Sequence, residues 1–188
     1  MSNFGMLITA STLTIIIMLI FTQCTYIIQT GIGIYYEGLE ALRHRISLES
    51  TAIEIINVTP QSNTTIYARI KNTGSCSIPV IQFNKMEIFV IGTLVNYTYP
   101  TVIRVPFDQS SIREEGWRVV SVYTNGVIGD VLNPIDLPSA LSGKWDPLEE
   151  LVIIITLSNK HALNLTHPIS VVFVAPNGVS TVEGGVQN

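Results

Sequence analysis

Hydrophobic residues dominate the first part of the chain, and no charged residue interrupts them before Glu37. Residues 1–36 contain no Asp, Glu, Lys, Arg or His, and residues 13–21 are the most apolar stretch. At about 1.5 Å per residue, a helix over residues 6–34 reaches about 43 Å, which exceeds the roughly 30 Å hydrocarbon core of a bilayer. Because backbone groups in lipid must be paired within the segment, the pattern predicts a transmembrane helix.

A cleaved secretory signal is the alternative for this segment. Signal peptides carry a basic stretch before the apolar region and small residues at the cleavage site. Residues 1–5 contain no Lys or Arg, and residues 27–30, Ile-Ile-Gln-Thr, offer a poor cleavage site. We therefore expect a retained anchor.

One face of the predicted helix carries small, hydroxylated or polar residues at spacings of three and four. These candidates for helix self-association are Ser11, Thr14, Met18, Thr22, Thr25 and Gln29. Such a face brings membrane helices together at about 1 kcal/mol per interhelical hydrogen bond. The alternative is that each hydroxyl bonds the carbonyl four residues earlier in its own helix.

The helical period continues beyond the apolar segment as a short amphipathic seam. Its apolar positions are Ile32, Tyr35, Leu39, Leu42 and Ile46, a spacing typical of a helix with one buried face. Gly31, Gly33 and Gly38 weaken the helix here and predict a hinge. We expect residues 1–49 to form one membrane anchor and stalk, helical from residue 6 to about 49.

Short runs rich in β-branched residues replace the helical period from Thr51 onward. The candidate strands are residues 52–58, 65–71, 78–83, 86–91, 101–106, 117–123, 127–132, 151–157 and 169–174. Asn125-Gly126 indicates a hairpin, because both residues tolerate the positive φ angles of a type I′ turn. So many short strands with little helix predict an all-β, immunoglobulin-like antiparallel sandwich over residues 50–188. Residues 151–157 are apolar on both faces, which predicts either a central strand or a strand covered by another subunit.

Composition excludes several classes of function. The net charge of the 188 residues is −4, and no run of Lys or Arg exists to neutralise phosphates, so we expect no nucleic-acid partner. The two cysteines, Cys24 and Cys76, lie in the apolar segment and in the sandwich, so we expect no disulfide between them.

No catalytic or metal-binding pattern is present in the sequence. His44 lies between two arginines, and His161 and His167 have no Cys or carboxylate at metal-ligand spacing. Glu114-Glu115 is typical of a solvated face, and residues 146–150 predict a turn. We expect no metal, cofactor or small-molecule substrate, and no enzymatic activity.

Four N-glycosylation sequons lie in the predicted sandwich, at Asn57, Asn63, Asn96 and Asn164. They favour a sandwich outside the cell, as do the many Thr and Ser residues and the low charge. Arg43 and Arg45 follow the apolar span and weakly favour the opposite orientation.

Five stretches resemble the archaellin and type-IV-pilin-like superfamily. Residues 53–58, 66–75 and 78–81 look like the start of the sandwich in archaellins and in their accessory proteins FlaF and FlaG, with Lys-Asn-Thr-Gly-Ser at 71–75 matching a Lys-Asn-x-Gly-Ser/Thr turn. Residues 144–147, Lys-Trp-Asp-Pro, resemble their Trp-x-Pro-Gly-Glu turn. Residues 175–179, Ala-Pro-Asn-Gly-Val, resemble their C-terminal x-Asn-Gly turn.

The resemblance implies a non-enzymatic, membrane-anchored component of the archaellum, the archaeal motility machine. Archaellin precursors carry a basic leader ending in Lys or Arg and Gly before the helix; this chain has no such site, so a stator protein like FlaF or FlaG is expected. The resemblance further implies one span in the archaeal cell membrane, homo-oligomers, and an external domain that binds surface-layer protein or a sister stator subunit. The alternative is an archaellin- or pilin-like subunit of an extracellular filament, with N-terminal helices bundled in the core.

Overall fold

The computed structural model describes residues 2–129, 133–139 and 142–185 of the chain. The chain divides into two compact units, Met1–Arg45 and Ile46–Asn188. The first unit is helical, and the second contains the last turn of the same helix and the described strands.

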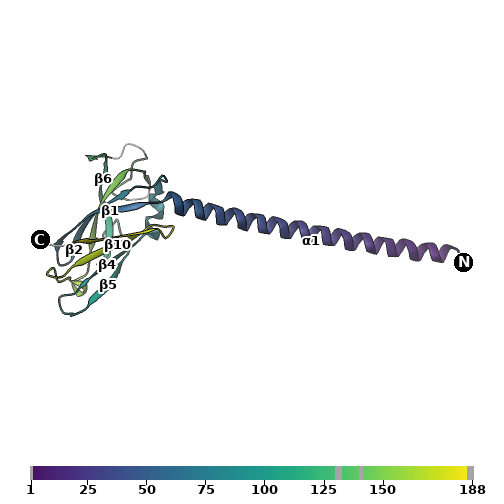
Figure 1. Ribbon diagram of the computed structural model, residues 1–188, viewed down its shortest axis with the longest axis horizontal. Coiled ribbons are helices and arrows are strands. Elements are labelled where there is room, and N and C mark those ends of the chain that lie inside the picture. Colours follow the sequence, from purple (N-terminus) through teal and green to yellow (C-terminus); the bar gives the residue numbers. More distant parts are fainter. Residues whose placement is uncertain (1, 130–132, 140–141, 186–188) are drawn as a thin grey trace. The chain divides into compact units, whose positions relative to one another are not determined.

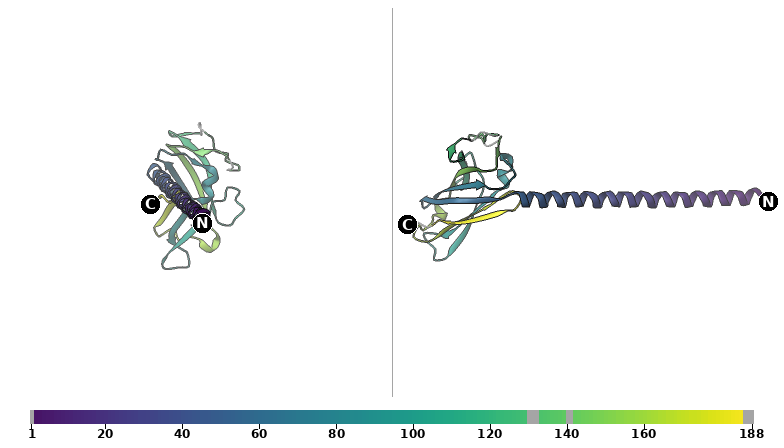
Figure 2. Two further views of the ribbon diagram at one scale, coloured as in Figure 1. Left: turned by 90° about the vertical axis from the view of Figure 1, so that its right-hand side faces the viewer. Right: turned by 45° about the horizontal axis from the view of Figure 1, so that its top comes forward.

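A single helix, α1 (Ser2–Ser50), accounts for the apolar N-terminal segment (Figures 1 and 2). Nearly all of its large apolar side chains are exposed, from Met6 to Ile46. By length and composition α1 is able to cross a membrane, a property that it shares with N-terminal signal sequences. The predicted long apolar helix is therefore confirmed, and it extends a few residues further towards the N-terminus than expected.

The glycines of the stalk do not interrupt α1. The helix continues through Gly31, Gly33 and Gly38, and a Cβ atom added to any of them would meet nothing within 4 Å. The expected hinge is therefore not visible as a break in the helix, because the hydrogen bonds of the backbone continue whether or not a side chain is present.

Most of the strands that the structure describes in the second unit belong to two antiparallel sheets. The larger has the strand order β1-β2-β9-β6-β7 and the smaller has the order β11-β10-β4-β5. Figure 1 labels β1, β2 and β6 of the larger sheet and β10, β4 and β5 of the smaller. The larger sheet comprises β1 (Ile53–Ser62), β2 (Thr65–Asn72), β6 (Gly116–Thr124), β7 (Val127–Ile128) and β9 (Glu149–Thr156). The smaller comprises β4 (Glu87–Thr93), β5 (Pro100–Val105), β10 (Ile169–Val174) and β11 (Ser180–Gly185). Strands β3 (Ile78–Pro79) and β8 (Lys144–Trp145) form a separate two-stranded sheet. The described residues also form the 3-10 helices η1 (Val80–Lys85) and η2 (Asn159–His161).

Alternation of buried and exposed residues along the strands builds one core between the sheets. β2 buries every second residue, and β10 buries Ile169, Val171 and Phe173, as the two-residue period of a strand requires. The ring of Phe173 lies 6.0 Å from that of Trp117 and 6.2 Å from that of Trp145. The predicted antiparallel β-sandwich is confirmed, while its immunoglobulin-like character stays a prediction.

Strand β9 is the central strand of the larger sheet, between β2 and β6. On its outer face Ile154 is opposite Tyr67 and Arg118 and is 9% exposed. The central-strand interpretation of residues 151–157 is therefore correct. The chain itself covers this strand without a second subunit.

Two predicted strands differ from the structure. Residues 78–83 were expected to be extended, but Pro79 ends β3 and the chain then turns into η1, which buries Val80 and Phe83. Proline lacks the N–H that a strand ladder needs. In the predicted strand 127–132, β7 covers Val127–Ile128, and residues 130–132 lie outside the described part of the chain.

The Asn125-Gly126 hairpin is confirmed: the φ angles are 52° and 79°, and Thr124 pairs with Val127. Strands β8 and β11 were not predicted from the sequence. β8 has two residues and is extended because it pairs with β3. β11 contains Ser, Glu and Gly, which favour strands weakly, and its pairing with β10 makes it a strand.

Replacement of Phe173 by Ala tests the shared core. We expect Phe173→Ala to lower the free energy of unfolding by about 3–5 kcal/mol, because it leaves a cavity between two buried indoles. Both tryptophans of the chain lie in this core, so their fluorescence during denaturation in detergent micelles reports the sandwich. Tyr99→Ala is the matched control, since that ring is 81% exposed and its loss should cost less than about 0.5 kcal/mol. Equal losses in the two variants would contradict this description of the core.

Candidate functional site

The last turn of α1 is held by the turn between β10 and β11. Asn177, in that turn, donates its side-chain amide to the carbonyl of Ser47 at 2.9 Å and to Oγ1 of Thr51 at 2.8 Å. Helices leave their last carbonyls without partners inside the helix. Asn177 therefore supplies a donor where the helix ends, and both partners belong to the compact unit Ile46–Asn188.

A second turn, after β2, approaches the same end of the helix. The backbone N–H of Ser75 donates to the carbonyl of Ser50 at 2.9 Å, and those of Thr73 and Gly74 donate to the carbonyl of Ala52 at 2.9 Å. A Cβ atom on Gly74 would lie 2.5 Å from the carbonyl oxygen of Ser50. Glycine is required here because the two backbones approach too closely for any side chain.

The buried side chain of Asn72 fixes the shape of this second turn. Its amide donates to the carbonyl of Cys76 at 2.9 Å and to that of Trp145 at 3.2 Å, and its oxygen accepts from the N–H of Gly74 at 3.1 Å. The indole N–H of Trp145 donates in turn to the carbonyl of Glu149 at 2.9 Å. The predicted turn at 146–150 is confirmed and supports Asn72, whose carbonyl accepts from the N–H of Leu148.

We call this region the junction: residues 47–52 with the turns at 72–76 and 175–179, supported by residues 145–149. It brings together three of the motifs that carry the resemblance, at 71–75, 144–147 and 175–179. The motifs at 71–75 and 175–179 contribute turns that bond the end of the helix, and the motif at 144–147 supports the first of these turns. Sequence comparison selected these motifs, but their common role depends on contacts between residues up to 130 positions apart.

Three of the four sequons gather at the other end of the sandwich. β1 begins beside the junction and runs for about 30 Å to the turn that holds Asn63. The N–H of Leu163 donates to the carbonyl of Asn63 at 2.7 Å, and that of Asn164 donates to the carbonyl of Thr93, three residues before Asn96. We call this end, residues 62–65, 93–99 and 158–164, the tip.

The sequon side chains differ in exposure. Asn57, Asn63 and Asn96 are exposed, whereas Asn164 is half-buried, and its Oδ1 accepts from the Oγ1 of Thr166 at 2.8 Å. Asn57 lies apart from the tip, at an irregularity in β1. Glycosylation of all four stays a prediction.

The hydroxyl groups of the proposed helix self-association face bond within α1. Ser11, Thr14, Thr22 and Thr25 donate to carbonyls three or four residues earlier at 2.8–2.9 Å, the alternative considered for this face. Met18 and Gln29 are exposed on the helix. Self-association stays a prediction, and it would depend on close packing of small side chains rather than on these donors.

Glu115 takes part in a contact that the sequence did not suggest. Its Oε1 accepts from the hydroxyl and backbone N–H of Ser158 and contacts Nδ1 of His161. Partial burial raises the pKa of Glu115, but the hydrogen bonds from Ser158 and His161 outweigh it, so the pKa of this carboxyl lies below its usual value. The expectation of a solvated face was wrong for Glu115, because its partners are 43 and 46 residues away.

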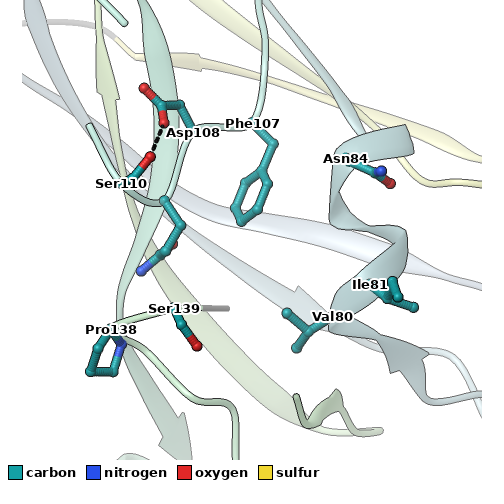
Figure 3. A pocket seen from close by; sticks show the side chains of 9 residues that line it. Val80, Ile81, Asn84, Phe107, Asp108, Ser110, Pro138 and Ser139 are labelled. Atoms are coloured by element: carbon teal, nitrogen blue, oxygen red, sulfur yellow. Dashed lines mark hydrogen bonds between the residues drawn. The ribbon is translucent and has the colours of Figure 1, made fainter. Parts of the chain in front are cut away.

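A shallow groove of about 590 Å³ lies between η1 and the loops around residues 107–110 and 138–139 (Figure 3). Its single carboxylate, Asp108, accepts hydrogen bonds from Ser110 and from the N–H of Arg113. Neither His nor Cys is among the residues that line the groove. Within the described residues, no three His, Cys, Asp or Glu side chains are grouped so that they could hold a metal ion.

Replacement of Gly74 tests the junction. We expect Gly74→Ala to destabilise the sandwich by about 1–3 kcal/mol, because its methyl group would overlap the backbone of Ser50 and Ala52. Gly184→Ala is the matched control, since its Cβ would make an ordinary 3.6 Å contact with Ser170. Denaturation followed by tryptophan fluorescence measures both. An unchanged stability for Gly74→Ala would rule out the close approach of the two backbones.

The Glu115 contact predicts a pH-dependent stability. Because its pKa is lower in the folded chain than in the unfolded chain, the contact stabilises fully above the unfolded value of about 4.5 and is lost as the pH falls through the folded value. We expect Glu115→Gln to cost about 1 kcal/mol at pH 7 and progressively less as the pH falls below about 4.5. Glu114→Gln removes a neighbouring, exposed charge and should leave the pH profile of stability unchanged. A constant difference between wild type and Glu115→Gln across this range would contradict the contact.

Comparison with known proteins bears on the fold. No protein-family model matches the sequence, and no curated protein matches it. The structure is similar to the archaeal flagellum of Methanospirillum hungatei strain JF1, with a TM-score of 0.57 and 9% identity over 94% of this chain and 90% of the other.

Two archaellum structures from Sulfolobus acidocaldarius are similar at lower scores. The periplasmic stator protein complex FlaF and FlaG has a TM-score of 0.47 and 18% identity over 70% of this chain and 86% of the other. The periplasmic stator protein FlaG has a TM-score of 0.46 and 19% identity over 71% and 98%. TM-scores below 0.5 are too low to establish that this chain shares the fold of the stator structures. The filament structure, at 0.57, shows a shared fold. The predicted resemblance to archaellum proteins is thus confirmed at the level of the fold.

Proposed function

We propose that the chain is a non-enzymatic, membrane-anchored component of the archaellum with a stator-like role. Residues 1–49 act as anchor and stalk, and residues 50–188 form a head domain outside the cell. The junction is the observation that carries this proposal. Two turns of the sandwich bond directly to the backbone of the helix end, so a load on the sandwich passes into the helix through hydrogen bonds and close packing.

The abrupt change at Glu37 supports anchoring in lipid. The uncharged segment before it is long enough to cross a bilayer, and charged residues occur regularly after it. A charged side chain at the centre of a spanning helix costs about 2.5–3.5 kcal/mol, which accounts for the lack of charge up to residue 36.

The tip supports a head domain outside the cell. Asn63 and Asn96 are exposed there, on loops that an oligosaccharide could occupy without disturbing a strand. The tip is also the end of the sandwich opposite the junction, and therefore the end best placed to meet a surface-layer protein or a sister subunit. In this proposal the head grips such a static partner while the motor turns the filament.

The second candidate function is a subunit of an extracellular filament. The likeness to the Methanospirillum hungatei flagellum supports this candidate at the level of the fold. In that case α1 would lie in a bundle of helices rather than in lipid. The two candidates therefore place the same apolar side chains in different surroundings, which an experiment can separate.

Fractionation of cells that produce the chain tests the proposal. We expect the chain in the membrane fraction after filaments have been sheared away, and we expect protease to digest the head in intact cells but not in inverted vesicles. Recovery of most of the chain in sheared filaments would favour the filament subunit. Digestion in inverted vesicles alone would place the head in the cytoplasm and contradict the proposal.

A matched pair of variants completes this test. Ile17→Arg places a charge near the middle of the uncharged segment and should reduce the membrane-bound fraction, because of the cost of that charge in lipid. Ile17→Leu keeps the side chain apolar and should behave as the wild type. Full membrane retention of Ile17→Arg would argue that α1 does not span the bilayer.

A further inference from the structure

A small polar pocket lies where β6 begins, beside the tip. Its volume is about 180 Å³, and its lining residues are Asp108, Ser111, Arg113, Gly116, Arg118 and Thr156. Gly116 pairs with Thr156 at the end of β9, two residues before Ser158 of the tip. Asp108 is the one lining residue that this pocket shares with the larger groove beside η1. The pocket is therefore a separate hollow in the head, with charged and hydroxylated walls.

The missing side chain of Gly116 creates this space. Gly116 and Arg118 lie on the same face of β6, because alternate residues of a strand share a face, and Thr156 is directly opposite Gly116. A Cβ atom on Gly116 would lie 2.7 Å from the Cβ atom of Asp108. Any larger residue would fill the pocket or push the loop away from the strand.

The loop between β5 and β6, which forms one wall, is held by its own hydrogen bonds. The N–H of Asp108 donates to the carbonyl of Trp117 at 2.9 Å, and the N–H of Trp117 donates to that of Pro106 at 2.9 Å. The carboxylate of Asp108 accepts from the hydroxyl of Ser110 at 2.9 Å (Figure 3) and from the N–H of Arg113 at 2.7 Å. A wall that is already ordered loses little conformational entropy when a ligand binds.

Two arginines bring positive charge to the pocket. Neither Arg113 nor Arg118 forms an ion pair with a described residue, whereas Arg69 and Arg104 do. Nη1 of Arg118 donates to the hydroxyl oxygen of Ser111 at 2.7 Å, which positions this guanidinium over the loop. A guanidinium carries five N–H donors in one plane and binds oxyanions through two of them at once. Most of these donors remain available to a ligand.

The carboxylate in the pocket does not cancel both arginines. Partial burial raises the pKa of Asp108, but the hydrogen bonds from Arg113 and Ser110 and the charge of Arg113 outweigh it, so the pKa lies below its usual value. Asp108 is therefore ionised at neutral pH and neutralises one guanidinium. The neighbouring carboxylates, Glu114 and Glu115, do not line the pocket. One positive charge is left in excess.

We propose that this pocket binds a small oxyanion of the size and charge of sulfate, either free or as the sulfate ester of a sugar. Its volume equals that of roughly six water molecules at about 30 Å³ each. This is enough for a five-atom anion and less than the roughly 300–1,000 Å³ of pockets for drug-sized ligands. Arg113 and Arg118 bind the oxygens of the anion, and the hydroxyl groups of Ser111 and Thr156 donate to them.

The two sources of the anion have different consequences. A free ion bridges the loop and the strand and stabilises the head alone. The sulfate ester of a sugar makes the pocket a point of attachment for a carbohydrate that faces the tip. This second consequence rests on the proposed function, which puts an external partner at the tip, whereas binding of the anion itself does not.

Isothermal titration calorimetry of the full-length chain in detergent micelles tests the site. The probes are sodium sulfate and glucose 6-sulfate, with glucose as the blank, in a buffer of low ionic strength that limits screening. We expect a dissociation constant in the millimolar range or below for the unmodified chain. In Arg113→Gln/Arg118→Gln, which removes both guanidinium groups, it should rise at least about tenfold for both anions.

A matched control makes the same change of net charge outside the pocket. Lys85→Gln/Arg104→Gln removes two exposed cations from η1 and β5 and should bind both anions as the unmodified chain does. Thr156→Val removes one hydroxyl donor and keeps both charges, so its affinity should fall by a smaller factor, about threefold. Circular dichroism and tryptophan fluorescence establish that each variant is folded.

The outcomes separate the sources of the anion and can overturn the site. Tighter binding of glucose 6-sulfate than of sulfate assigns the sugar ester as the ligand, and equal or weaker binding of the ester assigns the free ion. Three results would overturn the proposal: no binding of either probe at millimolar concentration, an unchanged affinity in Arg113→Gln/Arg118→Gln, or an equal loss in Lys85→Gln/Arg104→Gln. Because these measurements are made in micelles, they are independent of the fractionation that tests the proposed function.

Discussion

The last turn of a helix needs partners for carbonyl groups that the helix itself cannot satisfy. Here those partners come from the sandwich: the N–H of Ser75 bonds the carbonyl of Ser50, and the amide of Asn177 bonds that of Ser47. The closeness of this approach requires glycine at position 74. Because of these contacts, the junction is a packed part of the head and not a flexible linker.

The local features of the fold could be predicted from the sequence because they depend on neighbours along the chain. The uncharged run before Glu37, the alternation in β2 and the Asn125-Gly126 turn are all visible in short windows of sequence. The wrong prediction of a strand over residues 78–83 also has a local cause. The apolar residues there favour a strand, but Pro79 lacks the N–H that a strand ladder needs. β11 was missed because its pairing with β10 determines its conformation more than its own residues do.

The candidate site could be predicted in part. The resemblance identified the turns at 71–75 and 175–179 but not their structural role, which is to bond the end of the helix. That role depends on the spatial proximity of Asn177 and Ser47, which lie 130 positions apart in the chain. The same limit applies to Glu115 and His161. In a sandwich whose neighbouring strands are often distant in sequence, the chemistry of a surface is set by pairs that no local window contains.

The surfaces of the head differ in chemistry, and the difference constrains how the head can work. The junction end is tied to the helix, the larger sheet presents ion pairs to water, and the tip carries exposed sequons. The smaller sheet presents apolar side chains around the neutral pair Glu87 and Arg104. In the proposed function, a load applied to the tip passes through the sandwich to the junction, where hydrogen bonds and close packing transfer it to the end of the helix.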